Sequence, residues 1–167
     1  MLAIGIDPGT ATTGYGLVRA STSGELEAVD WGVILTPAKM PMPERLASIY
    51  SSLSELLKEQ KPDISAVESL FFQRNVRTAM SVGQARGVVL LALQQAGVPI
   101  ADYGPKEIKQ AITGYGGADK QQMQSMVRTL LHLDERPEPD DAADALAVAI
   151  CHLHSLRQKA LIEEQQS

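Results

Sequence analysis

The chain opens on a short stretch in which large apolar residues occupy alternate positions. Leu2, Ile4 and Ile6 form this pattern, and Asp7 follows directly before a Pro-Gly turn. The alternation predicts a β-strand, and its small intervening residues are typical of a strand covered on both faces. An acid at the tip of a buried strand needs a hydrogen-bond donor, a cation or a metal as its partner. A turn-initiating Asp is the simpler interpretation.

Two further strands are predicted directly downstream, over residues 12–20 and 25–35. The links between these strands are only a few residues long, which favours an antiparallel meander. Gly14 and Gly16 interrupt the second strand. Glycine inside a strand commonly marks a bulge or the close approach of another backbone.

A second acid stands at the end of a later strand. Apolar residues at helical spacing predict a helix over residues 44–59, and a short buried strand over 64–67 then finishes on Glu68. A strand, helix and strand in this order give parallel neighbours joined by a right-handed crossover. We therefore expect Asp7 and Glu68 at the same edge of the sheet, where sites of open α/β folds form.

The remaining pattern completes an α/β fold, with a mixed central sheet of an antiparallel meander plus parallel strands, flanked by helices. A long helix is apolar nearly all round in its second half, so it is buried on more than one side or contributes to a dimer contact. We expect one domain and a disordered polar tail, at residues 1–157 and 158–167. The further elements are predicted at residues 76–96 (helix), 98–101 (strand), a short helix from 105, 119–133 (helix) and 140–156 (helix).

Composition narrows the class of protein only slightly. Of the 167 residues, 44% are hydrophobic and 21% charged, as in ordinary globular proteins. No apolar run approaches the roughly 20 residues that span a bilayer. A single cysteine, Cys151, excludes an internal disulfide framework and fits a reducing cytoplasm. The net charge of −5 argues mildly against a nucleic-acid partner, although the clustering of basic residues matters more.

The final predicted helix begins with three acids. Asp141 and Asp144 are three residues apart and so share one face, whereas the helix macrodipole accounts well for Asp140. Ala143 and Ala145 flank Asp144 and let the helix lie close against the sheet. We expect this packing to present both carboxylates to the sheet edge.

The acids of two strand tips and one helix face then make a set of four, Asp7, Glu68, Asp141 and Asp144. Carboxylates gathered in this way repel one another, and each raises the pKa of the others unless cations neutralise their charge. Oxygen-only ligation suits magnesium or manganese, and the three histidines lack the spacing of a zinc site. Two ions about 3.5–4 Å apart would activate water and stabilise the leaving oxygen of a phosphodiester.

A separate stretch interleaves aromatic and basic residues: Phe71, Phe72, Arg74 and then Arg77. This combination is typical of surfaces that stack on unpaired bases. The alternative is that a Phe is buried in the core and the arginines are solvated.

Four motifs in this order resemble the RuvC family of bacterial Holliday-junction resolvases, over residues 1 to about 154. They are Asp7-Pro-Gly-Thr with Thr13-Gly-Tyr-Gly, Glu68-Ser-Leu-Phe71, Gly83-Gln-Ala-Arg86-Gly87 and Asp141-Ala-Ala-Asp144-Ala-Leu-Ala. The resemblance implies an RNase H-like fold, a homodimer and two Mg²⁺ ions per active site. It implies paired symmetric nicking of four-way junctions in recombination and DNA repair, with 5′-phosphate and 3′-hydroxyl ends. A branch-migration motor, RuvA and RuvB, is the implied partner complex.

The resemblance also assigns roles to single residues. The family's four acidic ligands fall on Asp7, Glu68, Asp141 and Asp144, and its lysines needed for activity and DNA contact fall on Lys109 and Lys120. Lys120 would stabilise charge on the scissile phosphate. The expected DNA contacts are Phe71, at the family's loop aromatic, with Phe72, Arg74, Arg77, Arg86, Lys109, Lys120 and the glycine-flanked Tyr115.

Two alternatives from other classes stay open. Asp7-Pro-Gly-Thr followed by Thr13-Gly also resembles the first phosphate loop of actin-like ATPases, which need a second lobe that 167 residues do not supply. A non-catalytic module that binds DNA junctions is the other alternative. Such a module is expected to lose acids, and all four are present.

Overall fold

The computed structural model describes residues 1–69 and 76–166. Five strands form one sheet in the order β3-β2-β1-β4-β5. The meander consists of β1 (Leu2–Asp7), β2 (Thr12–Ala20) and β3 (Leu26–Leu35), paired antiparallel. The two parallel additions are β4 (Ile64–Glu68), beside β1, and β5 (Ile100–Tyr103), beside β4. The predicted mixed sheet is confirmed.

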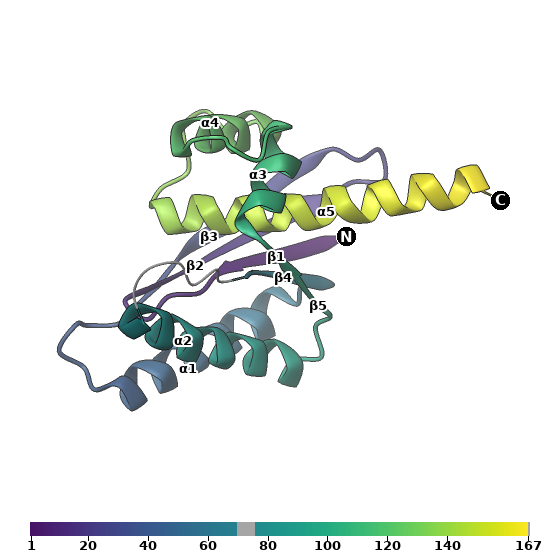
Figure 1. Ribbon diagram of the computed structural model, residues 1–167. Coiled ribbons are helices and arrows are strands. Elements are labelled where there is room, and N and C mark those ends of the chain that lie inside the picture. The colour runs from purple at the N-terminus through teal and green to yellow at the C-terminus, as the bar shows by residue number, and fades with distance from the viewer. Residues whose placement is uncertain (70–75, 167) are drawn as a thin grey trace.

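Helices cover both faces of this sheet, as Figure 1 shows. On one face lie α1 (Met42–Gln60) and α2 (Val76–Gln95). On the other lie α3 (Pro105–Thr113), α4 (Lys120–Leu130) and α5 (Asp140–Gln166). In the part of the chain that the structure describes, no helix combines the length and hydropathy needed to cross a membrane.

Several element boundaries differ from the prediction, and helix α4 ends at Leu130 instead of residue 133. Helix α1 begins at Met42, because Pro43 fits the first helical turn. Strand β5 begins at Ile100, because the Val98 amide still donates to the Leu93 carbonyl at the end of α2. The tail expected to be disordered from residue 158 continues α5 as helix to Gln166. Its residues are good helix formers without Gly or Pro, and they extend a helix that is already nucleated.

The strand period of two divides the core between the two faces. In β1, Ala3 belongs to the cluster under α5, and Ile4 and Ile6 belong to the cluster under α1 and α2. Asp7 follows the same alternation and falls on the α5 side. Cys151 of α5 is buried, and burial raises the pKa of its thiol to about 12, so the residue packs as a small apolar side chain.

Helix α5 lies unusually close to the strands beneath it. A Cβ atom on Gly14 would stand 2.0 Å from the Asp141 carbonyl oxygen, and one on Gly5 would stand 2.1 Å from the Ala145 oxygen. On the helix side Ala142 and Ala145 are fully buried. The close approach predicted from the strand glycines and helix alanines is therefore confirmed.

Candidate active site

The two strand-tip acids meet at the carboxyl edge of the sheet. Ile6 of β1 pairs with Val67 of β4 in parallel register, so Asp7 and Glu68 end neighbouring strands at the same level. The turn after Asp7 is closed locally, since the Thr13 hydroxyl donates to the Gly9 carbonyl at 2.6 Å. The backbone thus places both carboxylates as the sequence predicts.

The N-terminal turns of α5 bring the other acids to this edge. The amides of Ala142 and Ala143 donate to the Pro139 carbonyl and so start the helix at Asp140. Contact between Gly14 and the Asp141 backbone then fixes the height of the helix above β2. Because this turn of α5 lies directly on the meander, Asp141 and Asp144 come close enough to act electrostatically on Asp7.

The carboxylates affect one another's protonation. Burial raises the pKa of Asp7 to about 7, with further contributions from Asp144 and Asp141. Burial also raises the pKa of Glu68 to about 7, followed by repulsion from Asp7 and Asp144. The pKa of Asp144 is raised as well, chiefly by burial. Acids from β1, β4 and α5 therefore form one electrostatic cluster.

The chemistry of this cluster fits a hard divalent cation. Its donors are all carboxylate oxygens, and the burial and mutual repulsion that raise their pKa values are what a bound cation relieves. Within residues 1–69 and 76–166, however, no three His, Cys, Asp or Glu side chains stand close enough to make a ready metal site. The acids lie close enough to act on one another electrostatically. Binding a metal ion would require their side chains to move closer together.

Lys120, at the start of α4, lies across the acids of α5. Its Nζ atom is 2.9 Å from Asp140 Oδ2 and 3.7 Å from Asp144 Oδ2. Gln124 Nε2 donates to the other Asp140 oxygen at 2.7 Å. The hydrogen bond to Asp140 is the largest cause of a raised pKa at Lys120, so this amine stays protonated. Asp140 thus has a role beyond the helix dipole, because it holds the predicted catalytic lysine.

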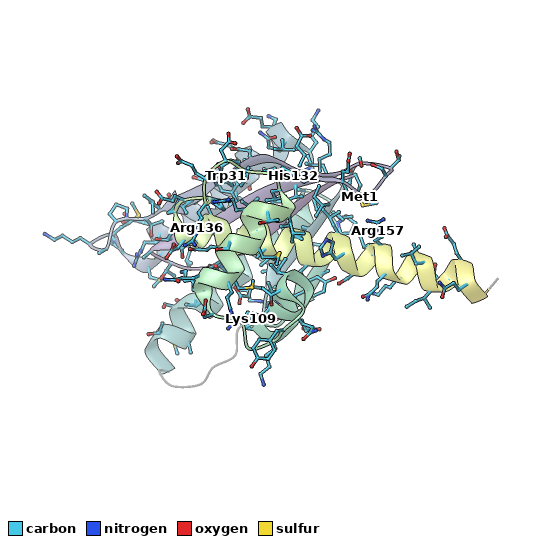
Figure 2. The ribbon with its side chains drawn as sticks, turned by 90° about the horizontal axis from the view of Figure 1, so that it is seen from above. Met1, Trp31, Lys109, His132, Arg136 and Arg157 are labelled. Atoms are coloured by element: carbon cyan, nitrogen blue, oxygen red, sulfur yellow. The ribbon has the colours of Figure 1, made fainter. Side chains whose placement is uncertain are left out.

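A hollow of about 210 Å³ opens beside these groups. Figure 2 shows α3 and α4 laid across the N-terminal part of α5, with the labelled Lys109 at the edge of that layer and Arg157 beyond it. Two acids and two lysines thereby share one small recess. The residues that line it are Glu68, Pro105, Ile108, Lys109, Lys120, Met123, Asp144 and Ala147.

The remaining predicted contacts are distributed unevenly. Tyr115 is 67% exposed in the turn between α3 and α4. Arg86 forms an ion pair with Asp102, a contact that the sequence did not predict. Arg77 lies on α2, with a side chain outside the described part. The predictions for Phe71, Phe72 and Arg74 lie outside the described residues.

Sequence reasoning missed two polar residues near the site, Gln124 and Asp102. Gln124 gives no signal of its own, since it is one of three glutamines near the start of α4. Asp102 does carry a sequence signal, because it is an acid near the end of a third parallel strand. Strand 98–101 was predicted too early along the chain, which left this acid outside it.

Comparison with known proteins agrees with this geometry. The family model described as crossover junction endodeoxyribonuclease RuvC matches residues 3–152. A protein of that name from Syntrophomonas wolfei is 55% identical over 163 residues, covering 98% of this chain and 94% of its own length.

Solved structures extend the agreement to the fold. The Thermus thermophilus RuvC structure superposes with a TM-score of 0.89 at 39% identity, covering 95% of this chain and 97% of that one. T. thermophilus RuvC in complex with Holliday junction substrate gives a TM-score of 0.87 at 37% identity, covering 95% and 96%. The RNase H-like arrangement that the resemblance implied is thus confirmed. By sequence and by structure, the chain belongs to the RuvC family of crossover junction endodeoxyribonucleases.

Proposed function

We propose that this chain resolves four-way DNA junctions by paired symmetric nicks, in a reaction that depends on Mg²⁺ at the four acids. The observation that carries the proposal is the electrostatic cluster of acids from β1, β4 and α5, in which Asp7 and Glu68 each have a pKa raised to about 7. Buried carboxylates that repel one another are poor structural elements and good ligands for cations. The Thermus relative bound to a Holliday junction supports the same substrate.

Asp7, Glu68, Asp141 and Asp144 would hold the ions, and Mn²⁺ is an acceptable substitute on the same chemistry. Bound divalent ions supply an activated water and stabilise the oxygen that leaves the scissile phosphodiester. The protein's part is to place the acids on three rigid elements, so that the phosphate is attacked in line. The products are a 5′-phosphate and a 3′-hydroxyl.

Lys120 would donate from its protonated Nζ to an oxygen of the scissile phosphate. Its Nζ atom lies 3.7 Å from Asp144 in this recess and 2.9 Å from Asp140, which in turn accepts a hydrogen bond from Gln124. A preorganised cation at this point stabilises the charge that develops in the transition state. Further DNA contacts are proposed for Lys109 and Tyr115 on this side, and for Phe71, Phe72, Arg74 and Arg77.

A homodimer would supply the second cut. Helix α2 carries an exposed stripe in which Met80 is 65% and Leu91 is 50% exposed. Between them, Cβ atoms on Gly83 or Gly87 would meet nothing within 4 Å. Apolar ends and an open, small-residue centre suit the close crossing of a second α2 about a two-fold axis. Two acid clusters would then face the two equivalent strands of a junction.

The setting of the reaction follows from the family. We infer that the dimer acts in the cytoplasm during recombination and DNA repair, together with the branch-migration motor RuvA and RuvB. Neither alternative from the sequence gains support. The family match spans most of the chain and leaves no unmatched lobe for an actin-like ATPase, and a non-catalytic module would not keep all four acids.

The test is a nicking assay on a four-way junction and on linear duplex of the same sequence, with and without Mg²⁺. We expect symmetric nicks in the junction only, and only with the metal, and ends that ligase reseals. Junction binding without any cleavage would favour the non-catalytic module. Equal cleavage of both substrates would contradict the assignment of junctions as the substrate.

A further inference from the structure

Three acids end the parallel part of the sheet, but they do not face the same way. Asp7 and Glu68 lie on the α5 side with the catalytic cluster. Asp102 lies one residue before the end of β5, and the strand period of two turns it to the opposite side. There it meets Arg86 of α2, whose Nη2 atom is 2.5 Å from Asp102 Oδ1.

The Arg86 side chain is largely enclosed where it meets Asp102. It is only 24% exposed, and its Nε atom is buried without a hydrogen-bond partner among the described residues. Packing around the guanidinium therefore leaves it little freedom beyond the single contact with Asp102. A charged bond of this length, with one partner largely enclosed, is stronger than an exposed surface pair.

The Arg86–Asp102 contact lies one register position from Glu68, a proposed catalytic acid. Asp102 pairs with Val67 in the sheet, and the next pair in the register is Tyr103 with Glu68. The Ser69 amide, directly after Glu68, donates to the Tyr103 carbonyl at 2.8 Å. The carboxyl end of β5 is thus hydrogen-bonded to the backbone directly after Glu68.

Both faces of β5 are anchored at this end. On the α5 side the Tyr103 hydroxyl and His152 Nδ1 are 2.9 Å apart. On the α2 side the Arg86–Asp102 pair supplies the matching anchor. Because β5 is a short edge strand, its end would otherwise be free to fray from β4.

We propose that Arg86 and Asp102 are positioning residues for Glu68. Their ion pair clamps the end of β5 to α2 and so sets the height of Glu68 at the sheet edge, where it would hold a divalent cation. The inference rests on the proposed metal-dependent function of the four acids. It gives Arg86 a task different from the phosphate contact expected from the sequence.

The experiment uses the full-length variants Asp102→Asn, Arg86→Gln and their double mutant, measured in single-turnover junction cleavage across a Mg²⁺ titration. Junction affinity is measured in parallel with EDTA over a range of salt concentrations. Glu27→Gln is the matched control, because it breaks the exposed Arg19–Glu27 pair on the meander, whose nearest charged atoms are 3.9 Å apart.

We expect each single variant to raise the half-saturating Mg²⁺ concentration by roughly 10-fold, as displaced supporting residues of metal sites do. The double mutant should cost no more than the larger single change, since both remove one contact. Metal-free junction affinity of Asp102→Asn should stay at the wild-type value or improve, because an acid has been removed. Glu27→Gln should leave both quantities unchanged.

Wild-type metal dependence in Asp102→Asn would overturn the proposal. Weaker metal-free binding and a smaller salt slope in Arg86→Gln alone would instead make Arg86 a phosphate contact. If Asp102→Asn does not fold, Arg86→Gln decides the matter by the same two readouts. Failure of the wild-type protein to cleave with metal would count against the proposed function itself, and is thereby distinguished.

Discussion

The two faces of the sheet are built differently at the edge where the active site forms. On the α5 face, Gly5 and Gly14 have no side chains and the helix opposite presents buried alanines, so two backbones come into contact. On the other face, large side chains such as Ile4, Ile6 and Leu53 separate the sheet from α1 and α2. The first face sets the position of the proposed catalytic groups, and the second supplies bulk burial.

The difference shows that an acid's role follows from the face it occupies. Asp7 and Glu68 lie toward α5, where repulsion and burial raise their pKa values. Asp102, at almost the same level of the sheet, lies toward α2 and is neutralised by Arg86. A one-residue change in register would exchange these roles, because alternate residues of a strand face opposite sides.

The largest expected effect comes from filling the close contact on the catalytic face. A side chain at Gly14 would meet the Asp141 carbonyl oxygen at 2.0 Å, so Gly14→Val must lift α5 from β2. We expect Tm to fall by roughly 10 °C and cleavage to be lost. Thermal melting and single-turnover cleavage measure the two effects.

Gly116→Ala is the control for this variant. Its new methyl group would meet ordinary contacts of 3.5 Å or more, and its backbone needs no left-handed conformation. Its Tm should stay near the wild-type value. A Gly14→Val protein with wild-type Tm and activity would show that the contact between α5 and β2 does not position the acids.

The next effect concerns the bulkier face, where the exposed stripe of α2 is proposed to form the dimer. We expect Leu91→Glu to give monomers that cut only one strand of a junction. Leu161→Glu is a matched control, since both leucines are 50% exposed but Leu161 lies near the end of α5. Light scattering measures the mass, and a cruciform plasmid separates single cuts (nicked circles) from paired cuts (linear product). A dimeric, fully active Leu91→Glu protein would remove α2 from the interface.

The smallest expected effect is on the stability of the metal-free protein. Folding raises the pKa of Asp7 from 3.8 to about 7, so the folded state binds the proton more tightly than the unfolded state. Stability from this group is therefore complete below about pH 4 and is lost as the pH rises to about 7. Asp7→Asn avoids this loss.

With EDTA, we expect Asp7→Asn and wild type to melt together at pH 4, and the variant to melt roughly 4 °C higher at pH 8. Mg²⁺ should stabilise the wild type more than the variant. Glu55→Gln, at an exposed position of α1, is the control and should show a difference that does not vary with pH. A flat difference for Asp7→Asn would mean that Asp7 is not held in the repulsive cluster.

The convergence of the acids could be predicted from the sequence because it depends on regular elements. Asp7 and Glu68 each end a buried strand, and a strand–helix–strand crossover brings such ends together. The spacing of Asp141 and Asp144 placed both on one helix face. These inferences need only the periods of strands and helices.

The contacts that hold the site could not be predicted in the same way. The Arg86–Asp102 pair depends on the register of a four-residue edge strand, and an error of two residues at its start hid the acid. The bond from Gln124 to Asp140 joins exposed side chains of two helices, and no period marks it. The length of α5 was missed because polar composition was taken to indicate fraying, although strong helix formers continue the helix to Gln166.

The most direct test of the central claim compares chemistry with binding in Asp7→Asn. Removing one carboxylate should abolish single-turnover junction cleavage in Mg²⁺, because a proposed metal ligand is lost. It should leave junction affinity unchanged or improved, because repulsion of the phosphate is reduced. Cleavage at the wild-type rate by Asp7→Asn would contradict the claim that the four acids form the metal-dependent active site.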